Sequence, residues 1–440
     1  MSRLLSWCLN GVYLTLLLLA CPWIVWSALT RGKYRDGFAQ KLLGRVPQRQ
    51  GDRRCIWLHA VSVGEVNLLQ TTLAKLKQQR PDWELVISTT TKTGYDLACR
   101  KYAEHTVFYC PLDFSWVVKN ALRRVRPDLL VLAELELWPN LIRQANSQGT
   151  KVAIINGRLS DNSFRGYRRF RPLVTRLLGQ IDLVAAQNEE TAQRFRELGA
   201  ERVVVTGSLK FDGAITRRDN PRTQELNQLA NFAADDIVFL AGSTQAPEEQ
   251  YAIDTFRALA ADYPCLRLIL VPRHPERFDE VANLLQHSGI PWTRRSTWDR
   301  NESAFRNPQS AILVDSIGEL GAWWGTATIG FVGGSFGSRG GQNMLESAAY
   351  GVATCFGPNT RNFRDIVAQL LAVDGARVVK SAEQLESFVR RALDDRTWAQ
   401  QLGQRARQLV LQQQGATERT VDLLLPLVGD PNALPRTEAA

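Results

Sequence analysis

Residues 55–65 read CIWLHAVSVGE, and this stretch decides the fold because it joins an apolar run to the start of a helix. The run 55–61 is continuous, as in a strand that both faces of a parallel sheet bury. Helix-length amphipathic segments separate it from similar runs at 84–90, 128–133, 151–156, 181–186 and 202–206. The pattern predicts a doubly wound α/β domain that ends near Gly207.

A second alternation of strands and helices begins at Ile237, and the chain looks helical from about Ser381 onward. Its apolar runs are 237–241, 266–271, 311–314, 328–332 and 352–356. The polar stretch between the two halves contains Asn220-Pro221 and is interpreted as a linker. We therefore expect an N-terminal membrane anchor at 1–31, a Rossmann-like domain at 32–211, a linker at 212–235, a second Rossmann-like domain with terminal helices at 236–428, and a frayed tail at 429–440.

The composition is that of a globular protein, with 45% hydrophobic and 22% charged residues. A length of 440 residues exceeds what one hydrophobic core usually supports, in agreement with two domains. The seven cysteines form no C-x-x-C pair and the four histidines lie apart. Nothing therefore supports a zinc site, and reduced thiols in a body that faces the cytosol are expected.

The net charge of +10 is concentrated in two segments. Residues 1–50 have a net charge of +6 and residues 158–176 of +5, so the rest of the chain sums to −1. A protein that binds nucleic acid would combine basic residues with a recognisable motif, and none occurs here. We therefore expect no nucleic-acid partner and favour anionic lipid or an anionic substrate.

The first basic segment follows residues 4–30, which contain no charged side chain. About 20 apolar residues in a helix span the hydrocarbon core of a bilayer. Basic residues follow at once, so the positive-inside tendency places the large carboxyl-terminal body in the cytoplasm. A cleaved signal peptide is the rival interpretation, which the long apolar part and the positive charge after it oppose. Asn10 and Pro22 interrupt the apolar stretch, so a helix that lies in the membrane surface is a third interpretation.

The second basic segment mixes arginines with apolar residues at positions 167, 170, 174, 177 and 178. This helical spacing predicts an amphipathic helix on the membrane-facing side of the first domain. The arginines are Arg165, Arg168, Arg169, Arg171 and Arg176. A helix packed on the core, with a solvated arginine face, is the alternative.

Two Rossmann-like halves imply a cleft between them, with ligands at the carboxyl ends of the strands. In the first half, such ends are followed by Glu65, by Glu134 with Glu136, and by Lys210. Glu65 can act as a base or stabilise the helix dipole. The acids after the strand at 128–133 can be functional or cap the next helix. Lys210 can bind an anion or form a surface salt bridge.

In the second half, Arg273 follows the run 266–271, where a guanidinium suits phosphate or carboxylate. Residues 333–346 read GGSFGSRGGQNMLE, between a strand and a helix. The N–H groups of such a loop and the start of the helix favour a phosphate. Glu346 would lie one turn inside the helix and accept hydrogen bonds from ribose hydroxyls. No Gly-Lys-Ser/Thr follows, so this is not a P-loop.

The chain contains no Asp-x-Asp pair, the usual means by which a transferase holds a metal-bound diphosphate. We therefore expect side-chain cations and the helix start to stabilise a leaving phosphate, with no metal and no other cofactor.

Five segments, taken together and in this order, resemble the motifs of the 3-deoxy-D-manno-octulosonic acid (Kdo) transferase family. They are 59–65, 134–140, 207–212, 272–277 and 333–346. The resemblance extends over nearly the whole chain, from the anchor to the final helices. It implies an inner-membrane enzyme of the GT-B type that moves Kdo from CMP-Kdo to the lipid A precursor (lipid IVA), with inversion at the anomeric carbon, in lipopolysaccharide biosynthesis.

The resemblance also implies roles for the matching residues. Glu65 matches the general base, and Glu134 and Lys210 match groups that stabilise the transition state, with Glu136 as the alternative to Glu134. The residues that match the CMP site are Arg273, His274, Ile317, Gly318, Glu319, Asn343, Met344, Leu345 and Glu346.

Two other functions remain open. Another membrane-associated GT-B transferase would use a UDP-sugar and a lipid acceptor, and a membrane-tethered nucleotide-binding scaffold would have no turnover. A fold of this class serves all three, so only the site can distinguish them.

Overall fold

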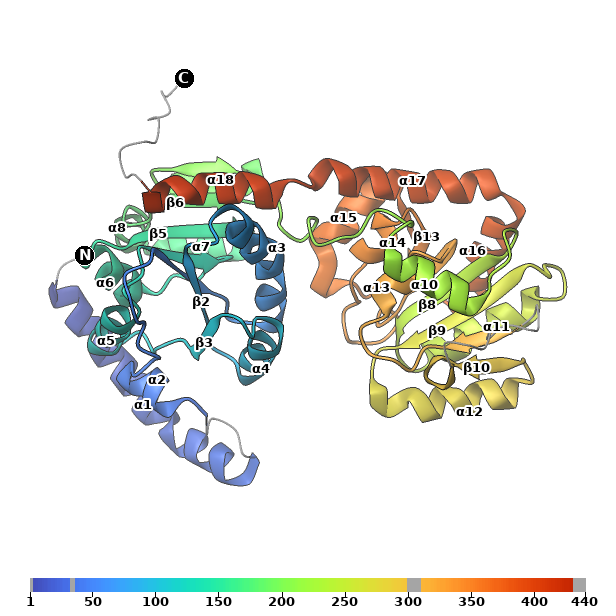
Figure 1. Cartoon of the computed structure of the whole chain (residues 1–440), viewed down its shortest axis with the longest axis horizontal. Coiled ribbons are helices and arrows are strands. Elements are labelled where there is room, and N and C mark those ends of the chain that lie inside the picture. Colours follow the sequence, from blue (N-terminus) through green and yellow to red (C-terminus); the bar gives the residue numbers. More distant parts are fainter. Residues whose placement is uncertain (1–2, 32–35, 299–309, 430–440) are drawn as a thin grey trace, which may run out of the picture. The chain divides into compact units, whose positions relative to one another are not determined.

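The computed structural model describes residues 3–31, 36–298 and 310–429. The chain divides into two compact units, Met1–Gly213 with Gln413–Ala440, and Ala214–Gln412. Each unit consists of a parallel sheet with helices packed on it (Figure 1). The prediction of two Rossmann-like α/β domains is therefore confirmed, whereas residues 430–440 of the predicted tail lie outside the described residues.

The described strands of the first unit form a sheet with the order β3-β2-β1-β4-β5-β6-β7. These strands are β1 (Cys55–His59), β2 (Glu84–Thr89), β3 (Thr106–Tyr109), β4 (Leu129–Ala133), β5 (Lys151–Gly157), β6 (Leu183–Ala186) and β7 (Val203–Val205). In β1, Cys55 and Trp57 belong to the core on one face, whereas Ile56 and Leu58 belong to the core on the other. Burial on both faces explains why the runs are continuous rather than alternating.

Helices cover both faces of this sheet, and several begin at a side chain that caps their first turn. Ser62, Thr91 and Asn188 each accept a hydrogen bond from the backbone N–H three residues later. The helices are α1 (Arg3–Arg31), α2 (Phe38–Leu43), α3 (Val63–Gln79), α4 (Lys92–Lys101), α5 (Ser115–Val125), α6 (Pro139–Ser147), α7 (Asp161–Arg169), α8 (Arg171–Leu178), α9 (Glu189–Glu197) and α18 (Ala416–Gly429).

Helix α1 contains a segment, Ser6–Thr30, that is long and apolar enough to cross a membrane by length and composition. The helix lies beside α5 on the outside of the unit (Figure 1). The amide group of Asn10 donates to Ser115 Oγ at 2.8 Å, and the hydroxyl of Tyr13 donates to Asp113 Oδ2 at 3.3 Å. One polar stripe of the helix is thus held by the body of the unit, while most of its large apolar side chains are exposed.

The arginine-rich segment forms two short helices, α7 and α8, rather than the single helix that its spacing predicted. The break falls at Phe170, because Pro172 in the first turn of α8 has no N–H to donate to the carbonyl group four residues earlier, at the end of α7. α8 buries Val174 and two leucines, whereas α7 has no buried residue. The exposed fractions of Phe170 and Leu173 are 63% and 44%, so apolar side chains remain at the surface among the arginines.

The described strands of the second unit form a sheet with the order β10-β11-β9-β8-β12-β13-β14. These strands are β8 (Ile237–Thr244), β9 (Leu266–Pro272), β10 (Trp292–Arg294), β11 (Ala311–Leu313), β12 (Ile329–Val332), β13 (Ala353–Phe356) and β14 (Ala376–Val378). The α-helices are α10 (Pro221–Ala230), α11 (Glu248–Leu259), α12 (Phe278–Ser288), α13 (Leu320–Trp323), α14 (Leu345–Ala349), α15 (Arg364–Ala372), α16 (Ala382–Asp394) and α17 (Arg396–Gln413). Short 3-10 helices lie at Pro275–Arg277, Arg295–Thr297 and Arg361–Phe363.

The segment 212–235 is not an unstructured linker, because it contains helix α10. Asn220 accepts a hydrogen bond from Thr223 N, and Pro221 occupies the first turn. An asparagine cap followed by proline is a strong signal for the start of a helix. Thr223, Leu226 and Ala230 are buried, so α10 is packed on the second unit.

The last helix also corrects the predicted domain boundary, since α18 packs on the first unit and not on the second. Val421, Leu424 and Leu427 belong to the same buried cluster as β1 and α3. Asp212 accepts hydrogen bonds from the backbone N–H groups of Gly415 and Thr417 at the start of the helix. The helical pattern of the sequence identified the helix but carried no information on which sheet it covers.

We expect Leu424→Ala to destabilise the first unit by about 2–5 kcal/mol, because it leaves a cavity beneath α18. Hydrogen exchange of the full chain should become faster in α3 and α18 and stay unchanged in α16. Leu411→Ala on α17, where the exposed fraction is 46%, is the matched control. If exchange became faster in α16 and stayed unchanged in α3, the packing of α18 on the first unit would be contradicted.

Candidate active site

The predicted site residues all follow the carboxyl ends of strands. In the first unit, the strand order reverses between β1 and β4, where parallel sheets of this type open a crevice. Glu65 follows β1, Glu134 and Glu136 follow β4, and Lys210 follows β7. Three glutamates and one lysine of the first unit therefore lie at a single edge of its sheet.

Glu65 lies in the first turn of α3, which Ser62 caps by accepting a hydrogen bond from Glu65 N. Its Oε2 accepts a hydrogen bond from Val61 N at 2.8 Å, and its Oε1 accepts one from Ser62 Oγ at 2.8 Å. Burial raises the pKa of the carboxyl group, and the negative charge of Glu134 raises it further, against the two hydrogen bonds. The carboxylate is thus held in one orientation and binds a proton more readily than a free glutamate.

Glu134 and Lys210 face each other, with 3.8 Å between Oε1 and Nζ. Glu134 has left-handed backbone, with φ 59°, which turns the chain sharply at the end of β4. The turn that carries Lys210 is fixed by Asn156, whose Oδ1 accepts from Leu209 N at 3.0 Å. Asn156 is itself left-handed, with φ 52°, and sequence reasoning missed it. The Asn156-Gly157 pair at the end of a strand was its only signal.

The pKa of Glu136 is raised more strongly than that of Glu65. Burial raises it to about 7, and the charges of Glu65 and Glu134 contribute, while the hydrogen bond from Trp138 Nε1 opposes them. Near neutral pH Glu136 is therefore part protonated, whereas Glu134 has a lysine beside it. The position beside Lys210 favours Glu134 over Glu136 as the acid that orients the lysine.

His59, the last residue of β1, is buried behind this cluster. Its Nδ1 lies 2.9 Å from Ser88 Oγ, and burial lowers its pKa to about 4. The ring is therefore neutral and packs edge-on to Trp138. His59 supports the site and does not carry charge in it.

The second unit brings Arg273 together with Asn343 and Glu346. Asn343 donates from Nδ2 to Glu346 Oε1 at 3.1 Å and accepts from Leu345 N at 3.1 Å. Burial raises the pKa of Glu346, against the effects of Asn343 and the positive charge of Arg273. Arg273 itself is exposed at the end of β9. His274, the next residue, has its Nδ1 3.7 Å from Glu276 Oε1.

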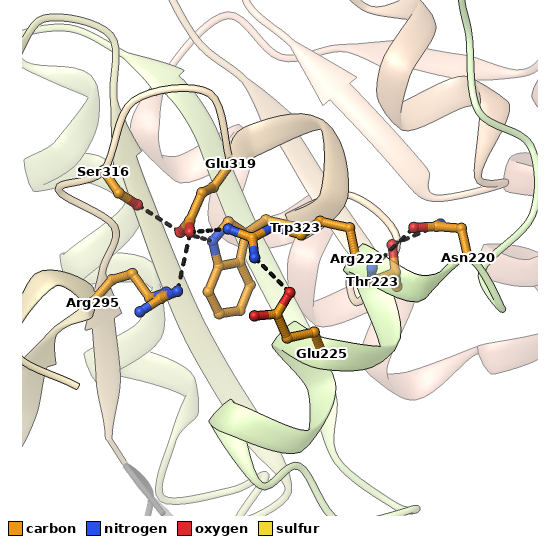
Figure 2. A network of polar contacts seen from close by, with 8 residues as sticks. All are labelled: Asn220, Arg222, Thr223, Glu225, Arg295, Ser316, Glu319 and Trp323. Carbon is orange, nitrogen blue, oxygen red and sulfur yellow. Dashed lines mark hydrogen bonds and ion pairs between the residues drawn. The ribbon is translucent and has the colours of Figure 1, made fainter. Parts of the chain in front are cut away.

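Glu319 is held by four donors that come from three parts of the second unit (Figure 2). Its Oε1 accepts from Arg222 Nη2 at 2.5 Å and from Arg295 Nη2 at 3.1 Å. Its Oε2 accepts from Ser316 Oγ at 2.6 Å and from Trp323 Nε1 at 3.4 Å. The carboxylate of Glu319 therefore fixes its own loop.

The tip of this loop carries the other two predicted residues. Ile317 has an exposed fraction of 83%, and Gly318 has φ 89°, a conformation that glycine adopts without strain. A Cβ on Gly321 would lie 4.0 Å from Glu346 Oε2, so this loop passes beside Asn343 and Glu346. The second unit thus brings the three predicted CMP segments together.

The glycine-rich loop differs from its prediction at residues 334–336. The N–H groups of Gly334, Ser335 and Phe336 donate to the buried carboxylate of Glu248 at 2.6, 2.8 and 2.9 Å. These groups were expected to face a phosphate, and that expectation is wrong because a side chain from the first turn of α11 already occupies them. The sequence does not show that Glu248 lies beside this loop, because the two segments are far apart in the chain.

The side chains of Met344 and Leu345 are buried. Of the residues 343–346, Asn343 and Glu346 are the ones with partly exposed polar side chains. Within the described ranges, no group of three or more His, Cys, Asp or Glu side chains is arranged as metal ligands.

Comparison with known proteins assigns first the class and then the family. The crystal structure of MurG from Acinetobacter baumannii matches 85% of this chain and 99% of its own, with a TM-score of 0.54 at 15% identity. With this geometry, the fold is that of the GT-B class of glycosyltransferases.

Residues 35–213 match the family described as 3-deoxy-D-manno-octulosonic-acid transferase (kdotransferase). A 3-deoxy-D-manno-octulosonic acid transferase of Haemophilus influenzae is 34% identical over 94% of this chain and 97% of its own length. One of Bordetella pertussis is 30% identical over 96% of this chain and 100% of its own. The chain belongs to the Kdo transferase family, which confirms the resemblance found in the sequence.

The pKa of Glu136 predicts how stability depends on pH. Its native value of about 7 exceeds the ordinary 4.5, so the native state binds more protons and loses stability as pH rises through that window. Glu136→Gln removes this loss, and the first unit should be more stable than wild type by ~1 kcal/mol at about pH 8, with the gain shrinking toward pH 5. Thermal unfolding at both pH values measures it.

Glu201→Gln, at an exposed position of the same unit, is the control and should show no such dependence. A Glu136→Gln variant with the same stability difference from wild type at both pH values would contradict the raised pKa.

Proposed function

We propose that this chain transfers Kdo from CMP-Kdo to the lipid A precursor, with inversion at the anomeric carbon. Membership of the Kdo transferase family supports the sugar. The observation that carries the mechanism is the oriented carboxylate of Glu65, whose pKa is raised at the switch point of the first sheet. A base of this kind suits the removal of a proton from an attacking hydroxyl.

In the proposed reaction, the acceptor hydroxyl attacks the anomeric carbon of Kdo from the face opposite CMP. Its proton passes to Glu65 as the new C–O bond forms, and the bond between the anomeric carbon and the phosphate oxygen breaks. Lys210, oriented by Glu134 at 3.8 Å, stabilises the negative charge of the transition state.

The donor is proposed to bind to the second unit. Arg273 and His274 would contact the phosphate, Glu346 with Asn343 would accept hydrogen bonds from the ribose, and the loop with Ile317 and Gly318 would contact the base. CMP has one phosphate, so the single negative group can be met by Arg273 without a metal ion. Glu319, Met344 and Leu345 would shape this site rather than contact the nucleotide through their side chains.

The acceptor is a lipid, and helix α1 supports a position at the inner membrane with the body in the cytoplasm. Hydrogen bonds from Asn10 and Tyr13 tie the first turns of the helix to polar groups of the body. Drawing those groups into hydrocarbon would be costly, so we propose that α1 lies in the membrane surface. The apolar side chains exposed on it are Trp7, Val12, Leu14, Leu16, Leu18, Leu19, Trp23, Val25, Trp26 and Leu29.

Glu65→Gln should reduce turnover by about 10²- to 10⁴-fold, the usual contribution of a general base. Glutamine can still accept the hydrogen bond from Val61 N, so folding and CMP binding should persist. Mass spectrometry of the product after incubation with CMP-Kdo and lipid IVA measures the transfer. Gln384→Ala, which opens a capping box of the second unit, tests whether loss of a cap alone affects turnover.

Activity of Glu65→Gln within a few-fold of wild type would leave Glu65 as a capping residue only. Thermal unfolding in the presence of each nucleotide distinguishes CMP-Kdo from the alternative donor, a UDP-sugar. CMP should stabilise the chain more than UDP, and the opposite order would favour the alternative.

The exposed arginines of α7 and α8 should help to bind the acceptor. Replacing Arg168, Arg169 and Arg171 by Gln should weaken binding to anionic vesicles and raise the KM for lipid IVA, with the KM for CMP-Kdo nearly unchanged. Each charge near such a surface contributes about 1 kcal/mol, so the change should be measurable at modest salt.

The control replaces three arginines of the second unit, Arg257, Arg390 and Arg391, by Gln. If both triple variants bind vesicles equally and have the same KM for lipid IVA, the arginines of α7 and α8 are ordinary solvated surface.

A further inference from the structure

The second unit contains a hollow at the amino ends of its strands, away from the proposed CMP site. Thr328, just before β12, and Gly351, just before β13, line it together with one face of α17. Arg273 and Asn343 lie beyond the carboxyl ends of strands in the same sheet. Because parallel strands have their carboxyl ends at one edge, the hollow belongs to the opposite edge.

Three arginines and two glutamines face this hollow, and none of the described residues that line it is an acid. Arg396, Gln400, Gln404 and Arg407 follow one another at helical spacing along α17, so they form one polar stripe. This helix runs along one side of the unit (Figure 1). A Cβ on Gly351 would lie 3.5 Å from Arg407 Cδ, so the stem of Arg407 extends across the wall of the hollow.

Arg218 completes the lining from the segment that precedes α10. Its Nε donates to Tyr350 O at 3.1 Å and its Nη1 to Gly325 O at 2.9 Å. Water reaches the side chain, yet desolvation by the protein around it lowers its pKa, and the positive charge of Arg407 lowers it further. A group that solvent reaches while protein surrounds it lies in the wall of a concave site. The repulsion from Arg407 is what a bound anion would relieve.

We propose that this hollow binds a small phosphate-bearing molecule. Its volume of about 410 Å³ is in the range of small-ligand sites. Guanidinium groups match the geometry of phosphate oxygens in pairs, and the glutamine amides add neutral donors at the rim. Three cations and no acid call for a ligand with more than one negative charge.

The first test is calorimetric titration of the full chain with inorganic pyrophosphate, in the presence of saturating CMP to fill the other site. Wild type should bind one pyrophosphate, and the double variant Arg396→Gln, Arg407→Gln should bind at least tenfold more weakly. Both arginines are exposed, so folding should not change. Arg405→Gln, on the same helix but paired with Asp374, is the matched control and should behave as wild type.

A second titration distinguishes a soluble phosphate from a lipid headgroup. Vesicles of phosphatidylcholine with phosphatidic acid are titrated with wild type and with the double variant. Pyrophosphate binding that depends on the arginines supports a soluble ligand, and vesicle binding with the same dependence supports a headgroup. If neither titration distinguishes the double variant from wild type, the proposal is overturned. Neither readout involves turnover, so failure here leaves the transferase reaction untouched.

Discussion

The structure depends on two parallel sheets that are buried on both faces. A charged side chain is costly to bury within a strand that has apolar cores above and below it, so the proposed chemistry lies at the ends of the strands. Trp57 and Leu58 illustrate the constraint, because they point to opposite faces of the first sheet and both are fully buried. The residues proposed to act in the transfer or to bind the nucleotide, such as Glu65, Lys210 and Arg273, are found beyond the carboxyl ends of strands.

That constraint explains how the acids of the first unit come to influence one another. Glu65 and Glu134 follow neighbouring strands, and the sharp turn at Glu134 keeps its carboxylate near that edge. Burial at this edge raises the pKa values of Glu65 and Glu136, and the negative charges of neighbouring glutamates raise them further. Lys210 lies 3.8 Å from Glu134, so the cluster combines two acids of raised pKa with a carboxylate that has a cation beside it.

Much of the fold could be predicted from the sequence, and the omissions share a physical cause. The central strands have continuous apolar runs, whereas the strands that were missed, β3, β10 and β14, are at sheet edges and only partly buried. Glu65, Glu134, Lys210 and Arg273 were found because position after a strand is visible in the sequence. Asn156 and Glu248 were missed because their importance comes from residues distant in the chain.

Glu248 has a consequence for how the loop after β12 meets a nucleotide. An anion that is part of the chain already neutralises the N–H groups of residues 334–336, so this part of the loop is ordered in the free protein. Binding of a nucleotide then costs no conformational entropy for ordering these residues, and they stay ordered when the nucleotide leaves. In the proposed reaction, CMP would leave and the next CMP-Kdo would bind on a surface that stays assembled between the two events.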